Sequence, residues 1–265
     1  MTEVLGRTVV STRSLGSVEV CTLDDGREVV VKRGDVAAEA AGLRWLAEPG
    51  VVAVPEVLDA DEAVLVTTLV PAGPASRPAA EAFGRELAAL HAAGAPAFGA
   101  PPPGGPADAW IGEAPMRNEP HDGPDGSWLD WYLADRVQPY LRTAVDRGAL
   151  SASAAARIEG ATTDPGPAEP PARLHGDLWS GNVLWSDRAW LIDPAAHGGH
   201  RETDLAMLAL FGCPHLDTVL AAYDEAAPLA DGWRYRVGLH QLFPLLVHAA
   251  LFGGGYGDAA LRAVT

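Results

Sequence analysis

A polar stretch held between two short apolar runs constrains this chain more than any other feature of its sequence. Asp177 is followed five positions later by Asn182, and a second carboxylate, Asp193, ends the next apolar run. Residues 183–185 and 190–192 are predicted to form two short strands that hold the polar residues rigidly. Phosphoryl transfer from a metal-bound nucleotide needs one carboxylate to accept the proton of the attacking hydroxyl, and an amide oxygen and a second carboxylate to hold Mg²⁺. The spacing therefore predicts Asp177 as the catalytic base and Asn182 and Asp193 as metal ligands.

The polar residues of this region also fit other roles. Asp and Asn are common in turns and loop caps, but the apolar runs on both sides favour a site. Asp193, His197 and His200 suggest a zinc site, which is disfavoured because glycines separate the histidines and no helical HExxH pattern is present. His175 is predicted to bond the backbone near the loop, and Glu202 and Asp204 to brace the loops.

The composition limits the classes of function. The chain has 265 residues, is 48% hydrophobic and 20% charged, and carries a formal net charge of −16. These values predict a soluble globular protein that is large enough for two lobes and too acidic to bind nucleic acid or an anionic membrane. Cys21 and Cys213 form no CxxC motif, the N-terminal residues lack a signal-peptide pattern, and residues 237–252 are too few and too polar to span a bilayer. We therefore expect a cytoplasmic protein with two reduced thiols.

The first 70 residues are predicted to form a small β-rich lobe with one helix. The turn signal Asp-Asp-Gly at residues 24–26 joins two of the strands. Asp35 is predicted to cap a helix over residues 36–47, and residues 71–73 break the chain after the last strand. The predicted strands are short runs rich in β-branched residues, at residues 7–14, 18–23, 28–32 and 63–69.

Residues 71–265 are predicted to form a larger, mainly helical lobe that contains the catalytic loop, residues 173–193. Ser127 is predicted to cap one helix and Asp204 another. Residues 94–126 are rich in proline and glycine and are predicted to be a loop without regular structure. Further helices are predicted at residues 79–93, 151–160, 204–211, 217–226 and 232–252. The fold class is α+β, with a nucleotide expected in the cleft between the lobes.

Three residues of the first lobe are candidates for binding the phosphates. Lys32 ends the third strand, where its side chain can reach the cleft, and Glu39 on the next helix can pair with it. Taken alone, these would be a surface lysine and a solvated glutamate; upstream of the catalytic loop, we favour the functional role. The phosphate-binding loop is expected near residues 11–17, where Gly16 is the single glycine and no Walker-type motif occurs.

Several stretches of the chain together resemble one known family. Residues 175–182, 191–195 and 199–207 closely resemble the fructosamine kinase (ketosamine-3-kinase) family, and the form Asp-Leu-Trp-Ser-Gly-Asn at residues 177–182 separates it from the aminoglycoside and choline phosphotransferases. Additional agreement is found at residues 39–43, 128–132, 136–139, 241–243, 248 and 251–253. The resemblance covers nearly the whole chain.

The resemblance implies a protein-kinase-like bilobal fold and ATP-dependent phosphorylation of the 3-hydroxyl of ketosamines, the fructosamine- or ribulosamine-type adducts that sugars form with amines, including lysine side chains on proteins. The phosphorylated adduct then falls apart, which repairs the amine. By the same resemblance, Lys32 and Glu39 form the phosphate-binding pair, the backbone of Thr68, Leu69 and Val70 meets adenine, and Asp177, Asn182 and Asp193 keep the roles given above. Trp179 would flank the sugar ring, and His197 would touch the sugar pocket.

Three departures from the family pattern bear on this interpretation. The phosphate loop is poor in glycine, Thr68 stands where many relatives have Glu, and His197 stands where an aromatic residue is common. Two alternatives stay open: a kinase of an amino sugar, an aminoglycoside or a choline-like alcohol, and a nucleotide-binding protein with little catalysis. The sequence leaves the physiological acceptor and the oligomeric state open.

Overall fold

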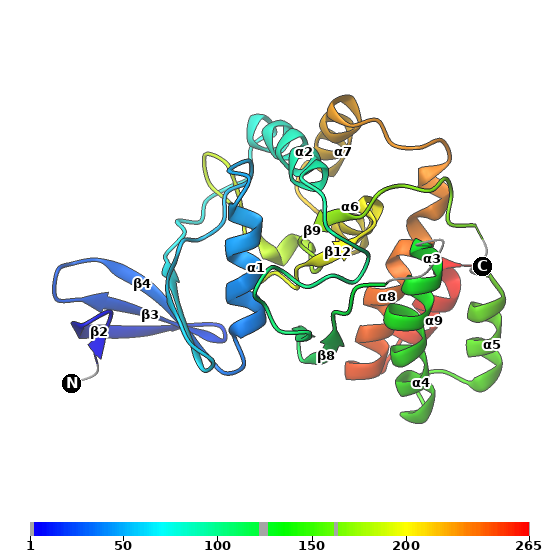
Figure 1. Cartoon of the computed structure of the whole chain (residues 1–265), viewed down its shortest axis with the longest axis horizontal. Coiled ribbons are helices and arrows are strands. Elements are labelled where there is room, and N and C mark those ends of the chain that lie inside the picture. The colour runs from blue at the N-terminus through cyan, green and yellow to red at the C-terminus, as the bar shows by residue number, and fades with distance from the viewer. Residues whose placement is uncertain (1–2, 122–126, 162–163, 265) are drawn as a thin grey trace.

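An antiparallel sheet and one helix form one end of the molecule (Figure 1). The structure is a computed structural model, and it describes residues 3–121, 127–161 and 164–264. The strands of this sheet are β1 (Glu3–Val4), β2 (Arg7–Leu15), β3 (Val18–Leu23), β4 (Glu28–Arg33), β5 (Val57–Ala60) and β6 (Val64–Thr68), paired in the order β1-β2-β3-β4-β6-β5. The four predicted strands are confirmed to within one residue at each end, and the short β1 and β5 are edge strands that the sequence pattern does not predict.

Strand β4 separates the core of the sheet from a cavity. Because side chains alternate along a strand, Val29 and Val31 are buried among the apolar side chains of one face, while Val30 and Lys32 line the cavity on the other. Helix α1 (Ala37–Ala47) covers this second face, where its Leu43 shares an apolar cluster with residues of the sheet. The packing of α1 brings the helix alongside Lys32.

The prediction that Asp35 caps α1 is wrong. Val36 occupies the position before the helix, and no side chain caps it there. The Asp35 carboxylate instead accepts a hydrogen bond of 2.8 Å from the indole nitrogen of Trp110, far away along the chain. The position of Asp35 just before the helix favoured a cap, but its carboxylate bonds Trp110 of another element instead.

The prediction that residues 94–126 lack regular structure is also wrong for part of that segment, of which residues 122–126 lie outside the described residues. Strands β7 (Asp108–Ile111) and β8 (Ala114–Arg117) form a hairpin whose turn begins with Gly112, at φ +56°. Its alternate side chains, such as Ile111 and Met116, are buried in the core of the helical lobe. The tight turn and this alternation explain why a Pro- and Gly-rich segment is ordered here.

Helices make up most of the remaining chain (Figure 1). Ser127 caps α3, as predicted, with its hydroxyl accepting from the Asp130 amide at 3.3 Å. Helix α2 lies against α7 so closely that a Cβ at Gly84 would stand 2.3 Å from the carbonyl oxygen of Val219. In the part of the chain that the structure describes, no helix has both the length and the apolar character needed to cross a bilayer. The helices are α2 (Arg77–Ala92), α3 (Trp128–Trp131), η1 (Tyr132–Val137), α4 (Gln138–Asp146), α5 (Ala152–Ala161), α6 (Arg201–Leu210), α7 (Leu216–Ala226), α8 (Trp233–Phe252) and α9 (Tyr256–Ala263).

Candidate active site

Two short strand pairs frame the loop that contains Asp177. Strand β9 (Ala172–Leu174) pairs with β12 (His197–Gly199), and β10 (Val183–Trp185) pairs with β11 (Ala189–Leu191). The loop from β9 to β10, which ends in the single turn η2 (Ser180–Asn182), therefore lies beside the segment from β11 to β12. Asp177 is in the first of these connections and Asp193 in the second. The predicted pair of strands at residues 183–185 and 190–192 is confirmed, with the second strand one residue earlier than predicted.

Asp204 holds the start of this loop. Its buried carboxylate accepts hydrogen bonds from the backbone amides of His175 at 2.8 Å and Gly176 at 3.0 Å, and it contacts the imidazole of His91 at 3.1 Å. Burial opposes ionisation, but the hydrogen bonds and the neighbouring imidazoles outweigh it and hold the pKa of Asp204 below its ordinary value. These hydrogen bonds confirm the prediction that Asp204 braces the loop. The prediction that it also caps α6 is wrong, because the helix begins at Arg201 and its cap is the side chain of His200.

His175 has the structural role predicted for it. Its Nε2 lies 2.9 Å from the carbonyl oxygen of Ile192, and its Nδ1 accepts from the amide of Asp177 at 3.3 Å. Since a carbonyl oxygen only accepts, Nε2 carries the proton and Nδ1 the lone pair. Burial lowers the pKa of His175 and keeps this neutral form. The imidazole thereby ties the Asp177 loop to the residue before Asp193.

Asn182 fixes the carboxylate of Asp177. The Nδ2 of Asn182 donates to the carbonyl oxygen of Asp177 at 2.8 Å and to its Oδ2 at 3.0 Å. Burial, helped by the nearby carboxylates of Asp193 and Asp204 and opposed by the hydrogen bond from Asn182, raises the pKa of Asp177 to about 6. The amide nitrogen is used in these bonds, which leaves the amide oxygen of Asn182 for another partner.

Lys32 lies between two carboxylates. Its Nζ is 2.6 Å from Glu39 and 3.1 Å from Asp193. Burial lowers the pKa of Lys32, but the two carboxylates outweigh it and hold that pKa above its ordinary value, so the ammonium stays charged. Burial, together with the charge of Asp193, raises the pKa of Glu39 to about 7. Asp193 has a positive φ of +51°, a conformation that costs a non-glycine residue about 1 kcal/mol and that aspartate tolerates better than most.

One cavity of about 420 Å³ collects the residues predicted to bind a nucleotide. Lys32, Glu39 and Asp193 provide its charged groups, while apolar side chains, among them Leu65 of the sheet and Leu184 of β10, provide most of the remaining lining. The predicted residues that it brings together are Gly16, Lys32, Glu39, Thr68, Leu69, Val70 and Asp193. An apolar cavity with a few convergent charges is the usual form of a small-molecule site.

A second cavity, of about 430 Å³, joins this charged group to Asp177. Lys32, Asn182 and Asp193 line it together with Asp177 and Trp179. Trp110, Gly112 and Glu113 of the β7–β8 hairpin also line it, and sequence reasoning missed them. The Gly-Glu turn between two short alternating runs was the signal that could have revealed this hairpin.

His197 was predicted, like Trp179, to contact the sugar, but it lies outside the cavities beside Asp177. It is 2% exposed, packs against the ring of Trp131, and its Nδ1 is 2.8 Å from the carbonyl oxygen of Ala195. Burial lowers the pKa of His197 to about 3. It is not among the described residues that line the cavities beside Asp177, whereas Trp179 lines two of them.

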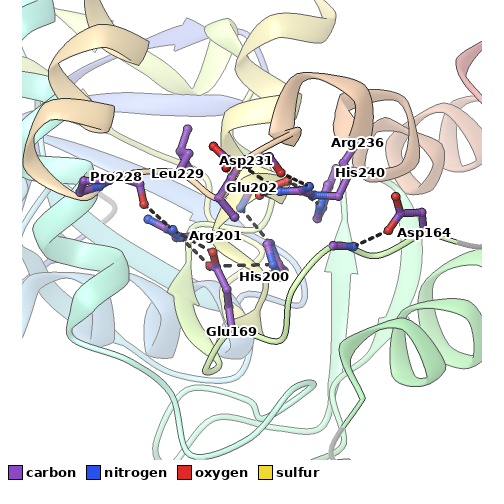
Figure 2. A network of polar contacts seen from close by, with 12 residues as sticks. Asp164, Glu169, His200, Arg201, Glu202, Pro228, Leu229, Asp231, Arg236 and His240 are labelled. Carbon is purple, nitrogen blue, oxygen red and sulfur yellow. Dashed lines mark hydrogen bonds and ion pairs between the residues drawn. The ribbon is translucent and has the colours of Figure 1, made fainter.

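The zinc alternative is also not favoured by the contacts. The structure places the imidazole of His200 near Glu202 and His240, rather than in a site with Asp193 and His197, and Figure 2 shows this network. Glu202 accepts from Arg236 at 2.6 Å and 3.0 Å, so a guanidinium already neutralises the carboxylate that a metal would need. Glu202 thus braces α8, to which Arg236 belongs, against the start of α6.

The lobes and the cavity between them define a class of protein, the phosphotransferases with a protein-kinase-like fold. Comparison with family models narrows this class, because residues 32–265 match the model described as Fructosamine kinase. The chain belongs to the fructosamine kinase family.

Individual relatives agree with this assignment. The crystal structure of a candidate fructosamine-3-kinase from Thermobifida fusca is 45% identical, with a TM-score of 0.89, over 98% of this chain and 93% of that chain. A protein from Thermus thermophilus named a probable ketoamine kinase is 35% identical over 86% of this chain and 80% of its own length. A macrolide 2'-phosphotransferase from Brachybacterium faecium, 20% identical over 98% of this chain and 94% of its own, shares the fold with a TM-score of 0.63.

Proposed function

We propose that this protein transfers the γ-phosphoryl group of ATP to the 3-hydroxyl of a ketosamine. The observation that carries the proposal is the position of Asp177. Its carboxylate, held by Asn182, lines the cavity that contains Lys32 and Asp193 and also a separate, mainly apolar cavity. A phosphoryl donor on one side of this carboxylate and a phosphoryl acceptor on the other would meet there. Membership of the fructosamine kinase family supports the choice of a ketosamine as acceptor.

ATP fits the cavity beside Lys32. The apolar lining near Thr68, Leu69 and Val70 suits an adenine ring, and the ammonium of Lys32 suits the phosphates. The glycine-poor loop at Gly16 also borders the cavity, so its backbone is in position to approach the phosphates.

The donor set near Asp177 fits Mg²⁺. Asp193 offers a carboxylate and Asn182 an amide oxygen, and hard oxygen ligands are those that Mg²⁺ prefers. When bound, Mg²⁺ would neutralise charge on the phosphates. We propose Asn182 and Asp193 as the protein ligands.

Asp177 would act as the general base. Its pKa of about 6 leaves it mostly ionised at neutral pH and close enough to that pH for effective proton transfer. The acceptor's 3-hydroxyl would give its proton to Asp177 as the oxygen bonds to the γ-phosphorus and ADP leaves. Trp179, which is half-exposed beside Asp177, would contact the sugar. The phosphorylated ketosamine would then decompose and free the amine.

An assay of ADP release tests the proposal. Ribulose-lysine and fructose-lysine are compared with an aminoglycoside and with choline, each in the presence of Mg-ATP. We expect turnover with a ketosamine and a loss of about 10³-fold in kcat for Asp177→Asn, with ATP binding retained in a thermal-shift measurement. Turnover of the aminoglycoside or choline alone would refute the ketosamine assignment. Retained turnover in Asp177→Asn would refute the role of Asp177.

A further inference from the structure

A cavity of about 450 Å³ lies beside Asp177 and shares none of Lys32, Asn182 and Asp193 with the neighbouring cavities. Helices α6, α8 and α9 and the turn of the β7–β8 hairpin supply most of its lining. It is therefore in contact with the proposed base but outside the region proposed for the nucleotide and metal. A molecule with its hydroxyl at Asp177 can extend into this space.

Large aromatic side chains line this cavity and remain partly exposed. Phe252 is 63% exposed, Trp179 40% and Phe211 38%. The ring of His248 lies between them, with its centroid 5.0 Å from Phe211 and 5.6 Å from Phe252, while Trp179 meets Phe211 edge-on at 6.2 Å. A contiguous exposed apolar surface of this kind marks a binding site, because exposing it to water is costly.

The charges around the cavity favour a cationic group. Its described lining contains two carboxylates, Glu113 and Asp177, and no Lys or Arg. The Nδ1 of His248 donates to the carbonyl oxygen of Pro244 at 2.8 Å. Carboxylates and aromatic faces both attract an ammonium. The ligand that fits has a cation near Asp177 and an apolar part beyond it.

We infer that this cavity binds the amine half of the acceptor, with Glu113 facing the secondary ammonium and the aromatic side chains contacting an apolar substituent on the nitrogen. The inference rests on the proposed function. In a ketosamine the nitrogen is bonded to C1, and C1 and C2 are the two carbons that separate it from C3. A 3-hydroxyl at Asp177 therefore keeps the ammonium close to that carboxylate. The cavity on the other side of Asp177 holds the proposed phosphate and metal residues, and the remaining sugar hydroxyls suit its polar lining at Asp35 and Trp110.

A protein with this cavity prefers ketosamines of amines with an aromatic or apolar group, a specificity that membership of the family leaves open. Two adducts of the same sugar test it, one made from methylamine and one from phenethylamine. We expect kcat/KM to be at least about tenfold higher for the phenethylamine adduct, since a buried apolar group gives discrimination of about this size. The Phe252→Ala variant should reduce the ratio of kcat/KM for the phenethylamine adduct to kcat/KM for the methylamine adduct to about threefold or less. The exposed position of Phe252 makes a folding defect unexpected.

Two further variants make the test specific. Tyr235→Ala removes a 94% exposed aromatic side chain that is on α8 but does not line the cavity, and it should leave the ratio unchanged. Glu113→Gln should raise KM for both adducts by a similar factor of about ten, because both carry the ammonium. A ratio below twofold in the native protein, or a ratio that Phe252→Ala leaves unchanged, would overturn the inference.

A binding measurement separates this inference from the proposed function. Calorimetric titration of both adducts into Asp177→Asn in the presence of Mg-ADP reports affinity without turnover. We expect the phenethylamine adduct to bind at least about tenfold more tightly. Equal affinities would overturn the inference while leaving the kinase activity in place. Absence of ADP formation with every ketosamine would instead overturn the proposed function.

Discussion

The ammonium of Lys32 lies 3.1 Å from the carboxylate of Asp193, although 161 positions separate the two residues. Lys32 belongs to β4 of the sheet and Asp193 follows β11 in the helical lobe, so this contact joins the two parts of the molecule across the cavity. Glu39 holds the same ammonium at 2.6 Å. One cation thus compensates two carboxylates, and its position depends on both lobes.

Replacing Lys32 by an uncharged residue should impair phosphoryl transfer from ATP. We expect Lys32→Met to lower kcat/KM for ATP by about 100-fold or more, because a preorganised charge beside a transferring phosphoryl group contributes this much to catalysis. Arg33→Met is the matched control: Arg33 is the next residue along β4, and its exposed side chain pairs weakly with Glu19 at 3.7 Å. Steady-state kinetics with varied ATP gives both values. A Lys32→Met enzyme within threefold of the native one would contradict the role given to Lys32.

The raised pKa of Asp177 should appear in the rate. A general base must be ionised, so kcat/KM for the acceptor should fall about tenfold per pH unit below a pKa of about 6. The pH profile is measured with ADP release at saturating ATP. Activity that stays constant from pH 7 down to pH 5 would show that no group of this pKa controls the step.

The raised pKa of Asp177 should also make the free energy of unfolding depend on pH. Burial raises the pKa of Asp177 in the folded protein from 3.8 to about 6, so the folded state binds more protons than the unfolded chain between those values. The contribution of Asp177 to the free energy of unfolding therefore falls as pH rises through this window, by on the order of 2–3 kcal/mol. Asp177→Asn should stabilise the protein, relative to the native one, more at pH 7.5 than at pH 4.5. Denaturant unfolding at the two pH values checks this, and an equal effect at both would contradict it.

Much of the site could be predicted because its residues are close in sequence. Asp177, Asn182 and Asp193 are placed by β10 and β11, whose apolar residues form a local pattern. Lys32 could be predicted because strand periodicity sends it and Val30 to one face. The role of Lys32 was favoured only together with the order of Asp177, Asn182 and Asp193 further along the chain.

The residues that sequence reasoning missed or misplaced depend on distant partners. Asp204 was expected to brace the loops, which holds, but also to cap a helix, and its partners are instead the imidazole of His91 and the backbone amides of His175 and Gly176, 29 and 28 positions earlier. Asp35 likewise bonds Trp110 of a hairpin in the Pro- and Gly-rich segment. A carboxylate suits a cap and a distant backbone amide equally well, so local spacing cannot choose between them.

Asp204 offers a test of how the catalytic loop is held. In Asp204→Asn an amide nitrogen replaces one acceptor, so one backbone N–H of the loop loses its partner in a buried place. We expect the free energy of unfolding to fall by about 2–3 kcal/mol and kcat to fall by about 100-fold, with little change in KM for ATP. Asp187→Asn, at an exposed carboxylate that accepts from Ser186 at 2.8 Å, is the control and should change neither value. Unchanged kcat in Asp204→Asn would show that the loop does not depend on this carboxylate.

Removing one charge of the buried pair Glu202 and Arg236 should lower the free energy of unfolding strongly, whereas replacing both residues by apolar ones should lower it little. Glu202 accepts two hydrogen bonds from Arg236 and also lies 3.4 Å from His240 (Figure 2). Glu202→Gln leaves the buried guanidinium without its counter-charge, so we expect a loss of about 3 kcal/mol in the free energy of unfolding. The double variant Glu202→Leu/Arg236→Met removes both charges and should recover most of that loss, because two charges taken from water together gain little over apolar groups of similar size.

An exposed pair provides the comparison. Glu81 and Arg85 lie one turn apart on α2 with a contact of 2.9 Å, and both side chains are close to half exposed. Because water screens such a pair, Glu81→Gln should cost less than about 0.5 kcal/mol. Guanidinium unfolding at pH 7 measures all three variants. If the double variant were as unstable as Glu202→Gln, the loss would come from packing around α6 and α8 rather than from an uncompensated charge.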